Sequence, residues 1–559
     1  MEGQAVREYG AYIDGAFRAI GTSTFEARDA ASGALLATLS RCGAEEINDA
    51  VEAARRAFPA WANLTTEERS AKILQFAALV EDRTEELAQL ECRDTGRHIR
   101  EMREDYRAAV SHLRYFASIS LAHHGFGREL ASGYLVAKRV PLGVCGQIIP
   151  WNDPVVMTAF KIAPALAAGN TVVLKPDENA CVSVMELARI AADVFPAGVF
   201  NVVPGLGEEA GAALIDHPKV SKLAFTGSTE VGRLVAHAAA SRLISTTLEL
   251  GGKSPSIVFP DIEDIDAVVA DATAGVLMCN GQSCLAGTRL FIHEDIYDAF
   301  VEKLVAGFRS LRVGPPLEED TELSGLIHKE HADRVISMIN SGIEEGAQVL
   351  TGGNRTVVPG FEAGNFVEPT ILEVTNSMRI AQDEIFGPVL CVLKWNNNEQ
   401  VITEANDTPY GLAAGIYTSN LKNAMETADR LDAGCVWINQ YFNLGGGVPF
   451  GGFKESVSGE SSASRRSTNT PNSNPSLSPR RRPRQTKETH IEYLGKYHLH
   501  CRRNLRYRTR TCSGPAERGE QSNHWRAAIR SAARDLGQVL GHRHGRHRCG
   551  RPEIHSNGV

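Results

Sequence analysis

Short apolar runs that alternate with helix-like segments constrain the fold of this chain most strongly. The first runs lie at residues 144–149, 171–174, 200–203 and 223–225, and helix-like segments between them include 156–168 and 182–194. Strand, helix and strand in alternation indicate a parallel sheet whose two faces are covered. A second set of runs follows at residues 289–292, 389–393, 413–417 and 435–439. The pattern predicts an α/β fold with two such domains and a catalytic cleft between them.

The region before residue 144 is typical of amphipathic helices. Apolar side chains recur at helical spacing at Ile47, Val51, Ala54 and Phe58. Thr65 and Glu68 form a capping-box signature ahead of the apolar run 73–80, which predicts a second helix. Residues 134–140 read as an inserted strand.

Composition excludes several classes of protein. A chain of 559 residues with 43% apolar side chains can form sizeable cores and more than one domain. No stretch is a signal peptide or long enough to cross a bilayer, so we expect a cytoplasmic protein without a membrane partner. The 11 cysteines lack the spacing of zinc sites, and their odd count favours reduced thiols over disulfides, so no metal is expected.

Two glycine-flanked motifs carry the chemistry. Cys284 lies in NGQSCLAG, and Glu249 lies upstream in TLELGGK. A thiol and a carboxylate in such settings suggest a nucleophile and a base. Each motif alone is modest evidence, because a small apolar Cys is more often a buried packing residue.

Both motifs resemble the aldehyde dehydrogenase superfamily, in its NAD-dependent, hydrolytic form. Further family motifs follow in the family's order: PWNDP from Pro150, KPDE from Lys175, FTGSTEVG from Phe225, EIFGP from Glu384 and PFGGFK from Pro449. The resemblance covers about residues 10–456. It implies a Rossmann-like NAD-binding domain (1–122 and 142–250) and a catalytic domain (251–440). Residues 123–141 and 441–456 would form a small β oligomerisation element and the C-terminal end of the family match.

The resemblance assigns three catalytic roles. Cys284 attacks the aldehyde, and the thioester that remains after hydride transfer is hydrolysed by water that Glu249 activates. The Asn152 amide and the Cys284 backbone amide form an oxyanion hole; otherwise Asn152 is an ordinary turn residue. The branch that transfers the acyl group to coenzyme A usually lacks this Glu, so a free acid is expected. Cys279 does not align with the nucleophile and is expected to be a packing residue.

Other motif residues are implied to bind NAD. Lys175 and Glu178 would hold the adenosine ribose, and a carboxylate there favours NAD over NADP; the alternative is a solvated surface pair. Glu384 and Phe386 would lie at the nicotinamide; without the resemblance they read as surface and core. The remaining cofactor candidates are Ile149, Pro150, Trp151, Gly207, Gly211, Phe225, Gly227, Ser228, Val231 and Leu250.

The glycines among these candidates have simpler interpretations. Gly227 follows a strand and precedes a helix, where backbone amides can approach a pyrophosphate, but a plain tight turn is equally compatible. The segment from Gly205 through Gly207 to Gly211 can be an ordinary loop. Asp153 departs from the family pattern, and an added anion near the substrate could depress the thiolate fraction or alter substrate preference.

The chain changes character after Ser456. Its net charge is −8, yet residues 457–559 are basic by roughly fourteen units and read as a non-family, largely disordered tail. A reading displaced by one base permits GVGRExGVEALDEYTQ over residues 457–472, the ending the family would supply. We therefore expect a frame displacement near Ser456, with residues 480–559 never selected as protein.

Two other functions compete with a dehydrogenase. The altered ending could yield an inactive or unstable product that at most binds NAD, with the family-like homodimer or homotetramer impaired. Nucleic-acid or metal binding through the Arg- and His-rich tail rests on composition alone, and no nucleic-acid partner is expected. The aldehyde substrate stays open.

Overall fold

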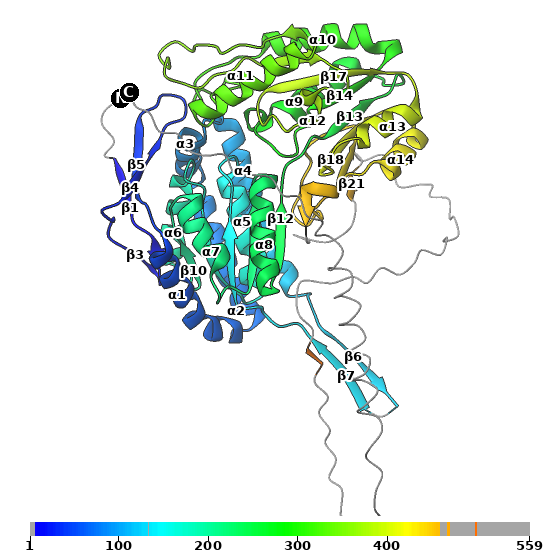
Figure 1. Cartoon of the computed structure of the whole chain (residues 1–559). Helices are drawn as coiled ribbons and strands as arrows, with labels where there is room; N and C mark the ends of the chain where they lie inside the picture. The colour runs from blue at the N-terminus through cyan, green and yellow to red at the C-terminus, as the bar shows by residue number, and fades with distance from the viewer. Residues whose placement is uncertain (1–5, 132, 459–466, 470–497, 500–559) are drawn as a thin grey trace, which may run out of the picture. The chain divides into compact units, whose positions relative to one another are not determined.

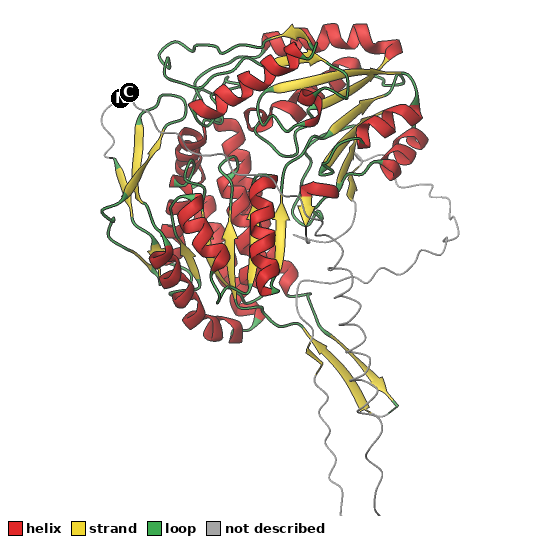
Figure 2. Ribbon diagram, viewed as in Figure 1, coloured by secondary structure: helices red, strands yellow, loops and turns green. Residues whose placement is uncertain are grey.

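Helices cover both faces of two large β-sheets (Figures 1 and 2). The computed structural model describes residues 6–131, 133–458, 467–469 and 498–499. The predicted disorder of the tail therefore concerns residues that lie almost entirely outside the described ranges. No helix within those ranges is long and apolar enough to cross a membrane.

The first large sheet has eight strands. In spatial order they are β20 (Val457–Ser458), β12 (Ser245–Glu249), β11 (Lys222–Thr226), β8 (Val144–Ile148), β9 (Thr171–Lys175), β10 (Phe200–Val202), β2 (Tyr12–Ile13) and β3 (Ala16–Phe17). The five strands from β12 to β10 are parallel, as predicted. The outer strands are antiparallel: β20 to β12 at one end of the sheet, and β2 to both β10 and β3 at the other. Each of these has only two residues, too few for a pattern to indicate a strand.

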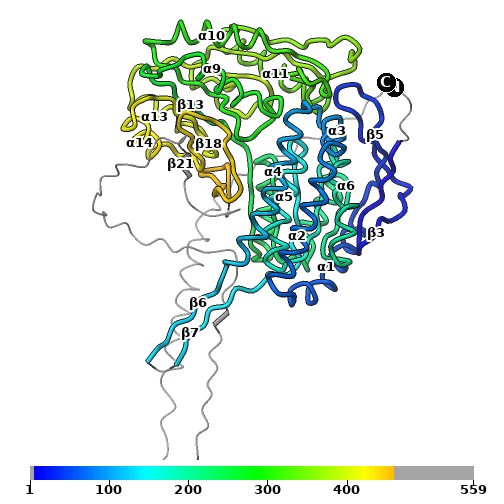
Figure 3. Tube along the Cα trace, turned by 180° about the vertical axis from the view of Figure 1, so that it is seen from behind, coloured from blue at the N-terminus to red at the C-terminus, as the bar shows by residue number. Residues whose placement is uncertain are grey.

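Side chains of the central strand β9 alternate between two cores. Val172 and Leu174 pack in one hydrophobic cluster, and Val173 packs in the other. One cluster contains α2 (Thr66–Asp82), α3 (Thr84–Thr95), α4 (Ile99–Ser120), α5 (Pro154–Ala167) and α6 (Val182–Ala192). The other contains α1 (Ala44–Asn63), α7 (Ala212–Asp216) and α8 (Thr229–Arg242). Figure 3, seen from behind, shows α2 and α4 in front. Burial on both faces explains why the strand reads as a continuous apolar run.

The predicted capping box is present at α2. The Thr65 side chain accepts from the Glu68 amide at 3.2 Å, and the Glu68 carboxylate accepts from the Thr65 amide at 2.7 Å. The two bonds satisfy amides that the helix itself leaves unpaired.

The second large sheet also has eight strands, in a mainly parallel arrangement. In order they are β15 (Gln348–Thr351), β16 (Thr370–Glu373), β17 (Val389–Trp395), β14 (Arg289–His293), β13 (Pro255–Val258), β18 (Ala413–Tyr417), β19 (Cys435–Ile438) and β21 (Ser467–Asn469). Only β15 is antiparallel among these described strands. One face packs against α9 (Ile265–Leu277) and α10 (Tyr297–Ser310). The other packs against α11 (Lys329–Glu344), α12 (Arg379–Gln382), α13 (Asn398–Asn406) and α14 (Leu421–Arg430).

Two small sheets complete the described fold. One contains β1 (Arg7–Tyr9), β5 (Leu35–Ser40) and β4 (Thr24–Arg28), which were not predicted. The other joins β6 (Phe126–Leu130), β7 (Gly133–Lys138) and β22 (His498–Leu499). The inserted strand predicted at 134–140 corresponds to β7, where Tyr134 is 73% exposed. The hairpin of β6 and β7 extends away from the first large sheet (Figure 1).

Candidate active site

The catalytic candidates lie at the carboxyl ends of strands in the first large sheet and in a loop that precedes β14 of the second large sheet. Glu249 ends β12, Asn152 lies between β8 and α5, and Lys175 ends β9. Open α/β sheets bind ligands at this edge of the parallel strands. Cys284 lies in the loop between α9 and β14. The fold therefore brings motifs that are distant in sequence to one edge.

The loop that carries Cys284 begins with an unusual backbone turn. Cys279, Asn280 and Gly281 have φ values of 57°, 56° and 74°, in the left-handed region. The Asn280 side-chain amide donates to the carbonyls of Gly96 at 3.0 Å and Gly325 at 2.9 Å. Such strain persists only where the surroundings hold the conformation. The buried Cys279 thus belongs to the turn, in agreement with its predicted packing role.

Asn152 contacts the nucleophile loop directly. Its Nδ2 atom donates to the carbonyl oxygen of Gln282 at 2.8 Å, and the side chain is buried. An amide nitrogen carries two hydrogens, and this bond uses one of them. The interaction fixes the amide next to the segment that leads into Cys284.

The Cys284 thiol is half-buried in an environment that favours its neutral form. Burial raises its pKa, and the charges of Glu384, Glu249 and Asp153 raise it further. The direction agrees with the expected effect of an anion at Asp153. However, Asp153 is not an isolated charge, because its Oδ1 accepts from Arg97 Nη1 at 3.0 Å. The unusual aspartate is therefore paired with a cation that the sequence did not reveal.

Glu249 is buried beside the loop that contains the cofactor candidates Gly227 and Ser228. Its backbone carbonyl accepts from the Gly227 amide at 3.1 Å. Nearby, burial lowers the pKa of Lys161 to about 8, while the charge of Glu249 opposes that shift. The carboxylate thus has a buried cation in its surroundings.

Ser456 joins the base segment to the loop of Gly411, which precedes β18 of the second large sheet. Its carbonyl accepts from the Leu250 amide at 2.8 Å, and its hydroxyl donates to the Gly251 carbonyl at 2.7 Å. The same hydroxyl accepts from the Gly411 amide at 2.9 Å. Strand β20, which follows directly, pairs Val457 with Glu249. Residues at the predicted end of the family match therefore support the strand that carries the base.

Lys175 and Glu178 form a pair at the end of β9. Lys175 Nζ donates to Glu178 Oε2 at 2.6 Å, and the Gly207 amide donates to Glu178 Oε1 at 3.3 Å. Burial alone would raise the pKa of Glu178, but Lys175 lowers it, and the net shift is downward. Lys175 is only 2% exposed, so the alternative of a solvated surface pair is wrong.

The segment from Gly207 to Gly211 is a helical turn, not the ordinary loop considered above. The turn leads directly into α7, which explains why its glycines do not need left-handed angles. Gly207 lies at its start, next to Glu178. Gly211 lies at its far end, and a Cβ built there would meet nothing within 4 Å.

The turn at Gly227 fits an anionic ligand. Ser228 caps α8 by accepting from the Val231 amide at 3.3 Å, and a Cβ on Gly227 would lie 2.6 Å from the Phe225 ring. The Thr226 and Thr229 hydroxyls are buried and have no hydrogen-bond partner among the described residues. Unpaired hydroxyls at a helix N-terminus are suited to the pyrophosphate of a dinucleotide. Neither threonine was predicted, because only the fold reveals their unpaired hydroxyls.

Glu384 and Phe386 contact two other candidate segments. Glu384 Oε1 accepts from the Gly252 amide at 2.9 Å, and burial raises the pKa of this carboxyl to about 7. The Phe386 ring lies 5.2 Å from that of Trp151, which follows Ile149 and Pro150 after β8. Both residues are half-buried, so the alternative of a surface glutamate and a core phenylalanine is wrong.

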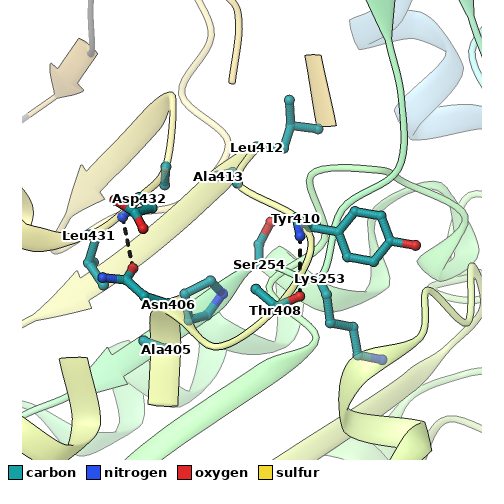
Figure 4. A pocket seen from close by; sticks show the side chains of 13 residues that line it. Lys253, Ser254, Ala405, Asn406, Thr408, Tyr410, Leu412, Ala413, Leu431 and Asp432 are labelled. Carbon is teal, nitrogen blue, oxygen red and sulfur yellow. Dashed lines mark hydrogen bonds between the residues drawn. The ribbon is translucent and has the colours of Figure 1, made fainter. Parts of the chain in front are cut away.

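Figure 4 shows a pocket at the end of the base segment, where Lys253 and Ser254 contribute to its lining. Lys253, Ser254, Asn406, Thr408, Tyr410 and Asp432 are among its lining residues. The Asn406 side chain accepts from the Asp432 amide at 2.8 Å. Cys284, Glu249 and Asn152 do not line this pocket, so it is not the place where the thiol would react.

Comparisons with known proteins agree with this geometry. A profile of the aldehyde dehydrogenase family matches residues 17–470. DhaS of Bacillus subtilis (strain 168) is 43% identical over 452 residues, which are 80% of this chain and 90% of that protein. The aldehyde dehydrogenase of Bacillus cereus, solved as an NAD+ complex, is 40% identical with a TM-score of 0.79, over 81% of this chain and 93% of that one. KauB, an aldehyde dehydrogenase of Pseudomonas aeruginosa, is 37% identical with a TM-score of 0.79, over 82% and 93%.

Proposed function

This chain belongs to the aldehyde dehydrogenase family, and from that premise we propose that it oxidises an aldehyde to the free carboxylic acid with NAD. The observation that carries the proposal is the close contact between the base segment and the nucleophile loop. A Cβ built on Gly252 would lie 2.1 Å from the carbonyl oxygen of Cys284. The motifs of Glu249 and Cys284 are therefore in backbone contact.

In the first step, Cys284 attacks the carbonyl carbon of the aldehyde and forms a thiohemiacetal. The thiol must lose its proton, which its buried and anionic surroundings disfavour in the resting chain. The second hydrogen of the Asn152 amide and the Cys284 backbone amide would stabilise the new oxyanion. Donors of this kind typically contribute about 3–4 kcal/mol to the transition state.

Bound NAD supplies the acceptor for the hydride that leaves the thiohemiacetal. Lys175, Glu178 and the turn of Gly227 and Ser228 would hold the adenosine and pyrophosphate portions. Glu384 and Phe386 would lie at the nicotinamide end. Glu178 favours NAD because a carboxylate accepts hydrogen bonds from ribose hydroxyls and repels a 2′-phosphate.

Glu249 would then activate a water molecule that hydrolyses the Cys284 thioester. A carboxylate can serve as this base only if it reaches the water, and its position at the carboxyl end of β12 supports that role. Release of the acid restores the free thiol.

The same proposal includes a cytoplasmic enzyme that assembles with copies of itself. The exposed hairpin of β6 and β7 supports an oligomerisation role, since Phe126 and Tyr134 are 58% and 73% exposed. The altered sequence after Ser456 is proposed to weaken that assembly.

Rapid-mixing measurements of NADH absorbance test the catalytic roles. Cys284→Ala should abolish turnover while NAD binding stays near wild type, and Cys279→Ala should retain activity. Glu249→Gln should give a burst of NADH without steady turnover, because only hydrolysis is stalled. Equal losses in the two cysteine variants would refute the nucleophile. A wild-type chain that binds NAD but oxidises no aldehyde of a broad panel would favour the inactive product.

A further inference from the structure

The Arg97 guanidinium lies buried beside the candidate site, and the proposed mechanism does not use it. Arg97 lies between α3 and α4, and its side chain is only 1% exposed. Three carboxylates surround it: Glu101 at 3.3 Å, Asp105 at 2.6 Å and Asp153 at 3.0 Å. A buried cation with this many partners is costly to assemble unless its geometry is well satisfied.

One part of the guanidinium holds the turn that carries Asn152. Arg97 Nη1 donates to the Asn152 backbone carbonyl at 3.1 Å and to Asp153 Oδ1 at 3.0 Å. The two acceptors are consecutive residues that immediately precede α5. Their common donor fixes the backbone from which the Asn152 amide reaches the Gln282 carbonyl.

Another part reaches the nucleophile loop through Glu101. Arg97 Nε donates to Glu101 Oε2 at 3.3 Å. Both oxygens of that carboxylate accept from the Cys279 amide at 3.2 Å. Cys279 begins the left-handed turn that leads to Cys284. Arg97 therefore connects to the turn that carries Asn152 and, through Glu101, to the start of the loop that carries Cys284.

The charges of the cluster are compatible with this connection. Burial would raise the pKa of Glu101, but Arg97 and His98 lower it to about 2, so Glu101 is an anion. Burial, together with Asp153 and Glu101, raises the pKa of Asp105 despite the attraction of Arg97.

We propose that Arg97 is a positioning residue that sets the geometry between the Asn152 amide and the loop of Cys284. The inference rests on the proposed role of Asn152 as an oxyanion donor. It also gives Asp153, the residue that departs from the family pattern, a function as the anchor of this guanidinium. An ion pair that only stabilised the fold would not need to contact both segments.

A double-mutant cycle on the full chain tests the proposal. The rate of the NADH burst is measured with saturating NAD for wild type, Arg97→Met, Asn152→Ala and the double variant. We expect Asn152→Ala to slow the burst by roughly 10²-fold or more. Arg97→Met should slow it by about 10²-fold, as for a displacement of about 1 Å in a reacting group. In the Asn152→Ala background, Arg97→Met should slow the burst by a smaller factor than in wild type, because one of the two groups that Arg97 positions is gone.

Two further variants protect the test from a simple loss of folding. Asp153→Asn keeps Arg97 and removes one charge, and we expect it to slow the burst about tenfold. This slowing should disappear in the Asn152→Ala background. Arg97→Lys keeps the charge but lacks the planar fork, so it should recover only part of the rate. Arg93→Met is the matched control, since Arg93 lies in the last turn of α3, four residues before Arg97, and pairs with Asp29 at 2.9 Å. It should leave the burst unchanged.

The outcomes separate this inference from the proposed function. If Arg97→Met and Asp153→Asn each slow the burst by the same factor in the Asn152→Ala background as in wild type, the positioning role is overturned. Asn152 would then remain the oxyanion donor. An unchanged burst in Asn152→Ala would overturn the oxyanion role, and the inference would fall with it. A Kd for NAD that is near wild type in every variant supports a positioning role, whereas a parallel loss of NAD binding would contradict it.

Discussion

Gly252→Ala should displace the nucleophile without changing any reacting group. The new Cβ would lie 2.1 Å from the Cys284 carbonyl oxygen, although real Cβ contacts essentially never fall below 3.0 Å. The neighbour is backbone, so one of the two segments must move by about 1 Å, and such a misplacement can cost about 10²-fold in rate. Overpacking should also lower the free energy of unfolding by about 1–3 kcal/mol.

Steady-state NADH production and thermal unfolding measure these two effects. Gly445→Ala is the matched control, because a Cβ there would meet nothing within 4 Å. It should retain wild-type activity and a wild-type Tm. A Gly252→Ala variant with full activity and an unchanged Tm would refute the contact between the base segment and the nucleophile loop.

Three further predictions concern the cofactor, pH and the C-terminal sequence. Glu178→Gln should relax the preference for NAD in kcat/KM, and a wild-type enzyme that prefers NADP would refute the argument. Burial raises the pKa of Glu91 to about 7 and of Asp94 to about 8, so the native state holds protons that the unfolded chain has released. The unfolding free energy should therefore fall between pH ~5 and ~8 in denaturant titrations, and Glu91→Gln should flatten that fall. Replacing residues 457–559 with the displaced reading and a family-like last strand should restore oligomer size and activity together; size-exclusion chromatography with no change would contradict the frame displacement.

The sequence predicts the parallel strands because strands that are buried on both faces consist of consecutive apolar residues. Residues 171–174 are apolar without interruption, since both faces of β9 are covered. Strands β2, β3 and β20 were missed because two residues cannot show a period. Their pairing depends on tertiary neighbours that the local sequence does not encode.

The candidate site likewise contains residues that the sequence predicts and residues that it does not. Cys284 and Glu249 stand out because their glycine-flanked motifs are contiguous in sequence. Arg97 does not, because an arginine is normally expected at the surface, and its carboxylate partners come from two different segments. Thr226 was missed for a related reason, since a buried hydroxyl without a partner becomes visible only in the folded chain.

Two of the hydrogen bonds that Ser456 accepts have a consequence for hydrogen exchange. The amides of Leu250 and Gly411 lie in loops, yet both donate to the fully buried Ser456. Neither amide can reach deuterated solvent until Ser456 leaves its place between the two segments. These two loop amides should therefore exchange as slowly as those in the neighbouring strand β12. The time needed to label them measures how often the strand that carries the base separates from the loop of Gly411.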